Sequence, residues 1–402
     1  MSKQVGKVLK PEFRFPEFRD AREWAIKPLN KLFTIGSGKD YKHLSSGDVP
    51  VYGSGGYMRS VNAYLYDGES ACIGRKGTIN NPIFLTGKFW TVDTLFYTHS
   101  FKECLPKFAY LIFQNINWLT HNEAGGVPSL SKTNIYKIEV AVPSPDEQEK
   151  IVECIVSIDE LITEQYKKIV SLKAHKKGLM QKLFPTDGET VPKLRFPEFR
   201  GAGEWERKQL KKVFSIFQGF AFSSKDSVTE GVRWLKIADV SIQKMNHNSP
   251  SFLPAEHEEK HKKFSVKQGD YVIALTRPVL SKQLKMAPVD KVFNGALLNQ
   301  RVGKLVTIQN SAFVYYLLQT SKLISDIEKS ISGSEPPNLS AQQIEGIKTY
   351  IPSNKKEQEK IADCLSSIDD LMTEQDKKII LLKAHKKGLM QQLFPVTDEV
   401  NE

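Results

Sequence analysis

Residues 147–185 read EQEKIVECIVSIDELITEQYKKIVSLKAHKKGLMQKLFP, and residues 357–395 read EQEKIADCLSSIDDLMTEQDKKIILLKAHKKGLMQQLFP, with 29 of the 39 positions identical. Apolar residues recur in both copies at the seven-residue spacing of a coiled coil. They are Ile151, Ile155, Ile158, Ile162, Ile169, Leu172, Leu179 and Leu183 in the first copy, and Ile361, Leu365, Ile368, Met372, Ile379, Leu382, Leu389 and Leu393 in the second. Each copy is therefore predicted to form one helix, roughly 54 Å long for about 36 residues.

The ends of both helices carry recognisable signals. A polar residue precedes a glutamate by three positions at Ser144–Glu147 and again at Asn354–Glu357, which predicts a capping box at each start. Pro185 and Pro395 are predicted to end the helices.

Polar residues interrupt the apolar rows at matching places, Gln165 and Gln375, and Lys176 and Lys386. Such residues cost stability and fix the register of a coiled coil, so the copies are expected to pair with something specific. In an antiparallel pair within one chain, Gln165 and Gln375 would lie close together. In a parallel pair between two chains, each would meet its own equivalent.

Composition limits the class of protein. The chain has 402 residues, enough for two or three domains, and 40% of them are apolar. It lacks a run of about 18 apolar residues and the apolar segment of a signal peptide, so a cytoplasmic protein without membrane contact is expected. Four cysteines without a CxxC pair argue against a disulfide framework or a zinc site. The net charge of +11 favours a polyanionic partner.

A second repeat precedes each half. The hexapeptide RFPEFR occupies residues 14–19 and 195–200, followed by Trp24 and Trp205, and its Pro and aromatic content predicts an extended clip lying against a folded body. The predicted domains are a clip with a first body at 1–146, a helix at 147–185, a linker and second clip at 186–205, a second body at 206–356, a helix at 357–395 and a tail at 396–402.

The two bodies share their endings but little else. An apolar segment, FAYLIF at 108–113 or FVYYLL at 313–318, is followed by a glycine-containing loop and then by PSLS at 128–131 or PNLS at 337–340. Apolar runs punctuated by glycine predict strands of a mixed sheet at 70–73, 81–86, 232–240 and 271–276. One scaffold with two different surfaces is the pattern expected of two readers with different targets.

Gly-rich and basic loops supply the candidate DNA contacts. Arginine and lysine suit guanine and phosphate, and asparagine and glutamine suit adenine. The alternative for any one of these residues is an ordinary role in a solvated turn or as a surface charge. The candidates are Lys39, Tyr57, Arg59, Arg75, Lys76 and Lys132 in the first body, and Ser223, Lys225, Arg277, Lys282, Gln283, Lys285, Asn299 and Arg301 in the second.

Catalytic signals are weak throughout. The segment Asn81–Phe84 has a faint likeness to the Asn-Pro-Pro-Phe motif of amino-methyltransferases, but it lacks the second proline and a glycine-rich cofactor loop ahead of it. Asp146 and Glu149 imitate a nuclease carboxylate set, yet their place in the first helical turn explains them through the helix dipole. We therefore predict no catalytic residues and no metal ligands.

The alternation of two variable bodies with two near-identical helices, the RFPEFR clips, the PxLS endings and the EQEKI…KKGLMQxLFP helices together resemble the specificity subunit of a type I restriction-modification enzyme. The resemblance covers essentially the whole chain. It implies an α+β protein in which two mixed α/β target-recognition domains are separated by two long antiparallel coiled-coil helices, with a pseudo-twofold internal repeat. It carries over no DNA-contacting residue, because recognition surfaces vary within that family.

The resemblance also implies partners. Each body would read one half of a split site on double-stranded DNA, and the helices would set the spacer and dock two modification (methyltransferase) subunits. S-adenosylmethionine, ATP and Mg would be bound by the modification and restriction subunits and not by this chain. Four apolar residues lie outside the apolar rows of the long helices: Leu161, Met180, Leu371 and Met390. They would either contact the modification subunits or only widen the contact between the two helices.

Three other functions remain open. In a related system, a single partner would both methylate and cut DNA. A DNA methyltransferase would bind its cofactor in the isolated chain, and the missing motifs argue against it. A purely structural coiled-coil protein would show no preference for DNA, and the basic, divergent bodies argue against that.

Overall fold

The computed structural model describes residues 10–331, 337–340, 343–344 and 346–395. Contacts divide the chain into two units that do not coincide with its sequence repeat. Unit 1 consists of Met1–Lys167 with Asp376–Glu402, and unit 2 of Lys168–Gln375. Each unit therefore contains one body together with one end of each long helix.

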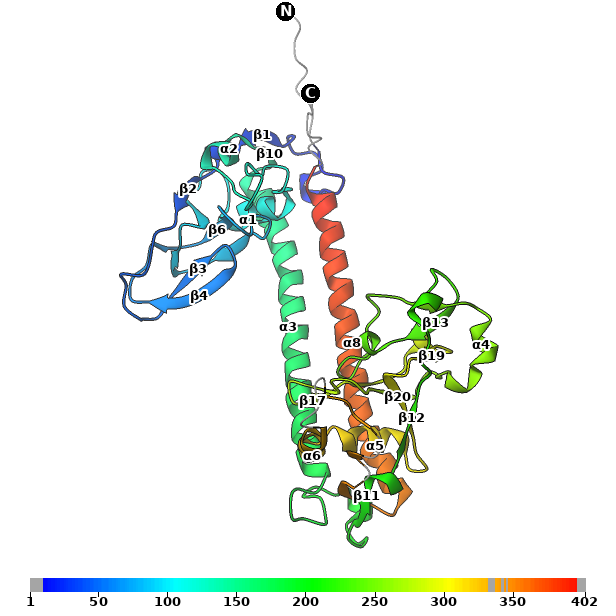
Figure 1. The fold of residues 1–402 in the computed structure, drawn as a ribbon. Helices are drawn as coiled ribbons and strands as arrows, with labels where there is room; N and C mark the ends of the chain where they lie inside the picture. The colour runs from blue at the N-terminus through cyan, green and yellow to red at the C-terminus, as the bar shows by residue number, and fades with distance from the viewer. Residues whose placement is uncertain (1–9, 332–336, 341–342, 345, 396–402) are drawn as a thin grey trace, which may run out of the picture. The chain divides into compact units, whose positions relative to one another are not determined.

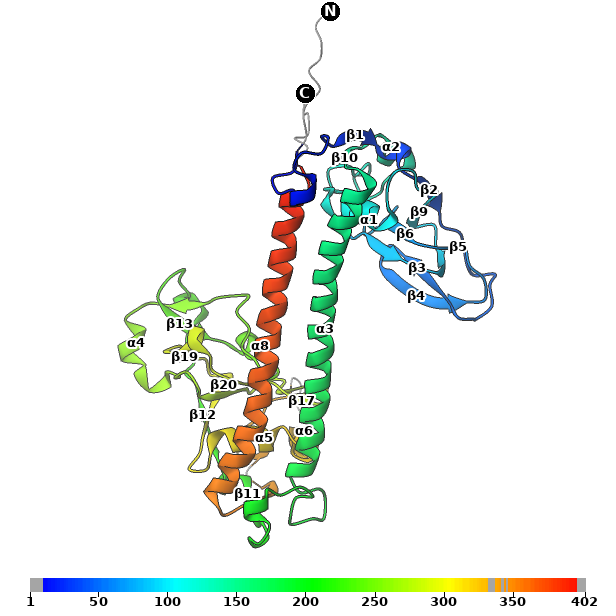
Figure 2. The same cartoon turned by 180° about the vertical axis from the view of Figure 1, so that it is seen from behind.

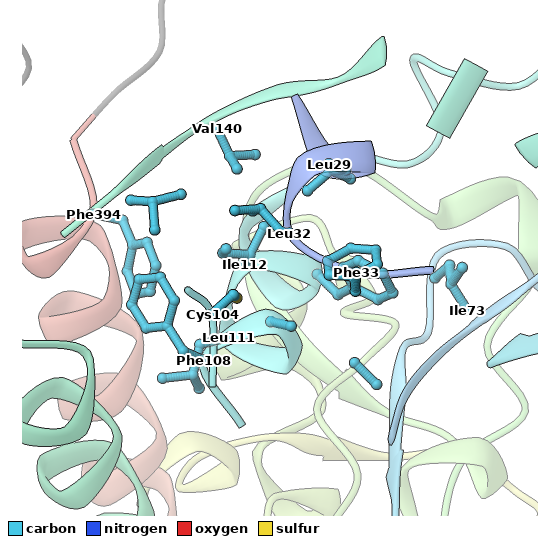
Figure 3. Close-up of a cluster of buried hydrophobic side chains, with 14 of the residues drawn as sticks. Leu29, Leu32, Phe33, Ile73, Cys104, Phe108, Leu111, Ile112, Val140 and Phe394 are labelled. Atoms are coloured by element: carbon cyan, nitrogen blue, oxygen red, sulfur yellow. The ribbon is translucent and has the colours of Figure 1, made fainter. Parts of the chain in front are cut away.

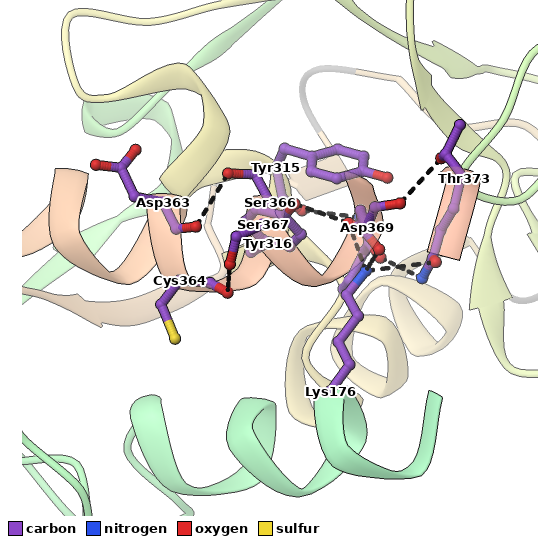
Figure 4. Close-up of polar contacts among 11 residues, drawn as sticks. Lys176, Tyr315, Tyr316, Asp363, Cys364, Ser366, Ser367, Asp369 and Thr373 are labelled. Carbon is purple, nitrogen blue, oxygen red and sulfur yellow. Dashed lines mark hydrogen bonds and ion pairs between the residues drawn. The ribbon is translucent and has the colours of Figure 1, made fainter. Parts of the chain in front are cut away.

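The long helices are α3, Pro145–Leu183, and α8, Lys355–Leu393, each 39 residues long (Figure 1). In unit 1 the Lys386 Nζ atom lies 2.7 Å from both carboxylate oxygens of Asp159. In unit 2 the Lys176 Nζ atom lies 2.7 Å and 2.8 Å from those of Asp369 (Figure 4). An early residue of one helix thus pairs with a late residue of the other in both units. None of the described helices combines the length and apolar character that crossing a membrane requires.

Unit 1 contains two four-stranded sheets. The first is antiparallel and has the order β2 (Thr34–Ser37), β9 (Leu95–His99), β6 (Ser70–Gly74), β7 (Ile83–Leu85). The second has the order β4 (Gly56–Val61), β3 (Val49–Gly53), β8 (Lys88–Thr91), β5 (Tyr66–Asp67), and β3 runs parallel to β8. Strand β1 (Ala25–Pro28) pairs with β10 (Glu139–Val142), immediately before α3.

Unit 2 repeats this topology. Its antiparallel sheet has the order β12 (Ser215–Gln218), β20 (Val302–Val306), β15 (Tyr271–Ala274), β18 (Met286–Pro288). A smaller sheet joins β14 (Phe252–Leu253), β13 (Val232–Leu235) and β19 (Leu297–Leu298), and β13 runs parallel to β19 as β3 does to β8. Strand β11 (Glu206–Gln209) pairs with β21 (Lys348–Ile351) before α8. The bodies are both mixed α/β, which confirms that part of the prediction.

One predicted strand is too long. Strand β13 ends at Leu235, whereas the apolar run predicted a strand to residue 240. A 3-10 turn, Ile237–Asp239, takes over because the Asp239 carboxylate accepts a 2.7 Å hydrogen bond from the Lys236 backbone N–H. That local bond competes with the sheet ladder for the same backbone groups.

A large apolar core joins the body of unit 1 to its helix ends (Figure 3). Helix α1, Pro106–Asn115, lies between β6 and the start of α3 in both views (Figures 1 and 2). Phe394, just after α8, stacks on Phe108 of α1 with ring centroids 5.5 Å apart and meets Trp24 at 6.1 Å. The end of α8 therefore completes the core of the first body.

Unit 2 builds the same core from the other helix end. Phe184, just after α3, lies 5.5 Å from Phe313 of α5 (Ser311–Leu318) and 6.2 Å from Trp205. Helix α6, Ser321–Ile331, follows and buries Leu323 and Ile327 in the same cluster. The shared FAYLIF and FVYYLL segments are thus the helices α1 and α5 that receive these phenylalanines.

Each clip is anchored by one glutamate. The Arg14 guanidinium donates to both carboxylate oxygens of Glu147, at 2.8 Å and 2.7 Å, and the indole of Trp24 donates to the same carboxylate. The capping box predicted at Ser144–Glu147 is half formed: the Ser144 hydroxyl accepts from the Glu147 backbone N–H at 3.4 Å, but the Glu147 carboxylate accepts from the clip and not from the Ser144 backbone. The middle of the clip, Pro16–Phe18, forms a 3-10 turn rather than an extended segment.

The second clip repeats the anchor. Arg195 donates to both oxygens of Glu357 at 2.7 Å and 2.8 Å, and Trp205 donates to it at 3.2 Å. Glu357 is 1% exposed, so its charge is stabilised by these donors rather than by water. The capping box predicted at Asn354–Glu357 lacks its glutamate half for the same reason, while the Asn354 side chain caps the Lys356 N–H.

Candidate nucleic-acid interface

Two loops that are distant in sequence meet beside β6 in the first body. The Leu130 N–H donates to the Arg75 carbonyl at 2.9 Å, and the Gly77 N–H donates to the Pro128 carbonyl at 2.9 Å. We call residues 75–77 with 128–130 the PxLS junction of body 1. The turn after β3 joins it, because the Ser54 hydroxyl donates to the Lys76 carbonyl at 2.8 Å.

Two predicted cations flank one buried ring at this junction. The Arg75 guanidinium carbon lies 6.0 Å from the Phe96 ring centre and the Lys132 Nζ atom lies 5.7 Å from it. Burial lowers the pKa of Lys132, and the charge of Arg75 lowers it further. An anion bound between the two cations would relieve this repulsion, as a DNA phosphate does.

The other first-body candidates lie on the second sheet. Tyr57 and Arg59 are on β4, where Tyr57 is 62% exposed and Arg59 donates to the Ser46 hydroxyl. Lys39 is exposed at the end of the segment that follows β2, and its carbonyl accepts from the indole of Trp90. These residues contact neither Arg75 nor Lys132 in the described contacts, so they form a separate exposed group.

Body 2 contains an equivalent junction, made of residues 275–277 and 337–339. The Leu339 N–H donates to the Leu275 carbonyl and the Arg277 N–H to the Pro337 carbonyl, both at 2.7 Å. Arg277 thus occupies the position that Gly77 holds in body 1. Its φ is +47°, a region that arginine rarely adopts, and the Gly77 φ is +91°. At this φ, arginine is strained and glycine is not. An arginine that occupies the position despite the strain indicates that its side chain has a function.

A hairpin follows Arg277, and the described residues after Gly77 in body 1 form no such hairpin. The hairpin consists of β16 (Val279–Leu280) and β17 (Gln283–Leu284), joined by a turn in which Ser281 and Lys282 both have positive φ. Leu284 is buried and anchors the hairpin, whereas Lys282 and Gln283 are exposed. Lys285 follows it, and burial lowers the pKa of its ammonium group.

The remaining four second-body candidates lie on the two segments whose backbones pair at Phe220 and Asn299. The Phe220 N–H donates to the Leu298 carbonyl, and the Gln300 N–H donates to the Phe220 carbonyl, both at 2.9 Å. Ser223 and Asn299 accept with their side-chain oxygens from the backbone N–H groups of Lys225 and Arg301. Ser223 and Asn299 therefore shape turns, while Lys225 and Arg301 are exposed on them.

Sequence reasoning passed over Phe220 itself. The available signal was the glycine before it: a Cβ atom at Gly219 would lie 2.3 Å from the carbonyl oxygens of Leu298 and Asn299. Only glycine permits this approach, so the segment QGFAFS is pressed against the 298–300 turn. Phe96, which receives Arg75 and Lys132, was passed over as well because it reads as an ordinary strand residue.

The predicted partner-binding residues differ in exposure. Leu161 and Leu371 are each 45% exposed on the long helices. Met390 is 8% exposed within the unit 1 core, and Met180 is half-buried against the unit 2 core, so both already have partners inside the chain. Exposed apolar residues that were not predicted are Val170, Ile380 and Leu381.

The enzymatic motifs have ordinary roles. Asn81–Phe84 leads into β7, where Phe84 packs against Tyr110. In the part of the chain that the structure describes, no three His, Cys, Asp or Glu side chains gather as a metal site would require.

Comparisons with known proteins agree on one family. The model described as the type I restriction modification DNA specificity domain matches residues 21–173 and again residues 202–383. The chain is 28% identical over 342 residues to the type I restriction enzyme MjaVIII specificity subunit of Methanocaldococcus jannaschii, covering 82% of this chain and 77% of that protein. It is also 28% identical over 249 residues to the EcoAI specificity subunit of Escherichia coli, covering 60% of this chain and 40% of that protein.

Solved structures share the fold. The crystal structure of a type I restriction-modification S subunit from M. genitalium matches with a TM-score of 0.64 at 15% identity, covering 97% of this chain and all of that one. A chain from work on complex assembly and conformational transition of the type I system matches with a TM-score of 0.51 at 14% identity, covering 92% and 97%.

Proposed function

This chain belongs to the family of type I restriction-modification DNA specificity domains, and we propose that each of its bodies reads one half of a bipartite DNA site. The membership confirms the resemblance drawn from the sequence. The observation that carries the proposal is the PxLS junction, which both bodies build with the same backbone hydrogen bonds and different side chains. Body 1 presents Arg75 and Lys76 there, and body 2 presents Arg277 and the hairpin behind it.

The long helices are proposed to form an antiparallel coiled coil with a pseudo-twofold repeat. The ion pairs Asp159–Lys386 and Asp369–Lys176 support this, because Asp369 lies 210 residues after Asp159 and Lys386 lies 210 residues after Lys176, so each pair joins the same two positions of opposite copies. The anchor glutamates Glu147 and Glu357 are also 210 residues apart, and each binds the first arginine of an RFPEFR clip. A helix pair stiffened in this way would act as a ruler that sets the unread spacer between the half-sites.

The chain itself is proposed to be non-catalytic. Two modification subunits would dock on the exposed apolar residues of the helices, such as Leu161 and Leu371, and would methylate one adenine in each half-site. S-adenosylmethionine would be bound by those subunits, and ATP and Mg by restriction subunits. The relatives' names as specificity subunits support this division of labour. The alternative, a single partner that both methylates and cuts, would use the same reading surfaces.

The test is to co-express the chain with a candidate modification subunit and to map methylated adenines by long-read sequencing. A split motif with one methylated adenine in each half is the expected result. Methylation confined to one continuous short site would contradict the two-reader model, and a chain without any DNA preference would support a structural role.

A further inference from the structure

Body 2 carries a group of aromatic rings at a different place from the Tyr66, Tyr97 and His99 group of body 1. We call Phe220, His261 and Phe264 the Phe220 platform. The Phe220 ring centre lies 4.5 Å from that of His261 and 5.3 Å from that of Phe264. Phe222 supports the platform from below, 5.1 Å from His261, and is itself part of a buried cluster with Trp234.

The outer ring of this platform is held toward solvent. Phe220 is 38% exposed although it is a large apolar residue. Its backbone is fixed by 2.9 Å hydrogen bonds to Leu298 and Gln300, and Gly219 lets the segment lie so close to that turn that a Cβ atom would clash. The Phe220 ring lies 5.0 Å from that of Phe222, so it contacts the buried cluster and still keeps more than a third of its surface open to solvent. Two exposed candidate DNA contacts are close to it along the backbone: Lys225 lies five residues after it, and Arg301 follows the turn that binds its backbone.

The segment around the platform carries Glu256, Glu258 and Glu259 as well as Lys260, Lys262 and Lys263, but the charges that act on His261 are those of Lys260 and Lys263. The Lys263 Nζ atom lies 5.0 Å from the Phe264 ring centre, and Lys260 belongs to the short helix α4, His257–Lys260. Lys262 is paired with Glu259 at 3.1 Å, so its charge is largely balanced. Burial lowers the pKa of His261, and neighbouring His257, Lys260 and Lys263 lower it further, which indicates a positive local potential.

An aromatic face with a cationic rim suits a nucleobase on a phosphate backbone. Stacking provides affinity without a hydrogen-bond code, and basic residues hold the flanking phosphates. Proteins that insert apolar side chains between base pairs kink the duplex and favour flexible pyrimidine–purine steps. A protein partner would be less well matched, because the exposed apolar area is one ring surrounded by charge.

We propose that Phe220 stacks on a DNA base at a kinked step in or beside the half-site read by body 2. This inference rests on the proposed function. It gives body 2 a means of sensing DNA deformability in addition to the side-chain readout at its PxLS junction. Within the described ring contacts of body 1, the ring at the junction is Phe96, which is buried and cannot stack in this way.

The experiment uses the full chain in complex with its modification subunit and a duplex carrying the mapped site. Phe220→Leu keeps the apolar volume and removes the aromatic face, and it is expected to weaken binding roughly tenfold. Phe220→Trp is expected to bind within about twofold of the wild type. Ile308→Ala, which removes a 78% exposed apolar residue elsewhere in unit 2, is the control and is expected to leave binding unchanged.

A second readout locates the base. Replacing adenines one at a time by 2-aminopurine should reveal one position whose fluorescence changes on binding by the wild type and not by Phe220→Leu. Should that variant prove unstable in a thermal melt, the added indole fluorescence of Phe220→Trp decides instead, since stacking on DNA quenches it. Equal binding and equal 2-aminopurine responses for Phe220→Leu and wild type would overturn the inference, as would unquenched indole.

Failure of the inference can be told apart from failure of the proposed function. If Phe220→Leu behaves as wild type while the complex still methylates a split motif, only the stacking contact is refuted. If the wild-type complex methylates no split motif, the proposed function itself falls.

Discussion

Lys176 and Asp369 form an ion pair between α3 and α8, with the lysine Nζ atom 2.7 Å from one carboxylate oxygen and 2.8 Å from the other (Figure 4). The phenol of Tyr316 donates to the same carboxylate at 2.7 Å. Burial lowers the pKa of Lys176, and the Asp369 charge opposes that shift. The lysine that interrupts the apolar row of α3 therefore has a dedicated partner in unit 2.

The two interhelical ion pairs are expected to differ in strength. Lys176 is 7% exposed in its side chain and Asp369 28%, whereas Lys386 is 17% and Asp159 44%. Lys176→Met should therefore cost about 3 kcal/mol, because it leaves a partly buried carboxylate without its ammonium partner and with the Tyr316 hydrogen bond alone from the contacts described above. Lys386→Met should cost about 1 kcal/mol or less, because water screens Asp159. Urea unfolding of both variants measures this, and equal costs would contradict it. Adding Asp369→Leu to Lys176→Met should restore part of the loss.

The second clip should detach when its anchor is shortened. Arg195→Ala removes both hydrogen bonds to the buried Glu357 and is expected to destabilise unit 2 by about 3–5 kcal/mol. Arg195→Lys keeps the positive charge but cannot donate two parallel hydrogen bonds to Glu357. The free energy of unfolding should therefore fall by about 1.5–3 kcal/mol. Limited proteolysis should then cut within residues 186–205. Arg200→Ala, at an exposed site of the same clip, is the matched control, expected within about 0.5 kcal/mol of the wild type.

Arg277 should affect specificity and stability in opposite directions. Arg277→Gly removes a side chain that we propose reads a base. The methylated motif should therefore become degenerate at one position of one half, with a loss of about 1–3 kcal/mol of discrimination between bases. The same change relieves a positive φ and should stabilise the fold by about 1 kcal/mol. Motif mapping and urea unfolding measure the two effects, with Lys211→Ala as an exposed control. An unchanged motif would remove Arg277 from the reading surface.

Helix length is expected to set the spacer. One heptad is inserted after Lys167 and one after Gln375, where the contacts divide the chain into units. Seven residues are one full coiled-coil repeat, so the apolar rows of both helices keep facing each other. Seven residues add about 10.5 Å, the length of about three base pairs. The methylated motif should therefore gain about three unread base pairs and keep both half-sites. An unchanged spacer in a folded, active variant would refute the ruler.

Two buried thiols predict a loss of stability in alkali. Burial raises the pKa of Cys72 and of Cys104 from 9.0 to about 12. A raised pKa stabilises the folded state fully below pH 9, and this contribution is lost as the pH rises toward 12. At pH 10.5 each thiol should have lost about 2 kcal/mol. In the double variant Cys72→Ala with Cys104→Ala, the free energy of unfolding should therefore fall less steeply between pH 8 and 10.5 than in the wild type.

The elements that could be predicted from the sequence are those determined by the spacing of nearby residues or by the repeated segment. The long helices and the strands near residues 70–73 and 271–276 follow from spacing, which adjacent residues encode. The glutamate half of each predicted capping box is missing because the Glu147 and Glu357 carboxylates bind arginines more than 130 residues away in the chain. Likewise Asp159 and Asp369 lie off the predicted apolar rows, so the partners of Lys386 and Lys176 could not be found by periodicity.

The candidate DNA contacts show the same limit. Composition identified basic loops, but only the folded chain brings the PSLS loop to Arg75 and the PNLS loop to Arg277. The equivalence of Gly77 and Arg277 rests on those long-range hydrogen bonds, since the surrounding sequences differ. Phe220 escaped notice because an exposed position cannot be distinguished from a core position in so short a segment.

The seating of Phe394 in the first body has a consequence for how the protein is made. Most of that core is synthesised by Ile155, yet Met390, Leu393 and Phe394 complete it. At about 5–20 residues per second a ribosome needs roughly 10–50 s to bridge the interval. During that time the first body emerges with an apolar socket open beside Trp24 and Phe108. We expect it to depend on chaperones until translation ends, and a chain truncated before residue 389 to be cleared by proteases.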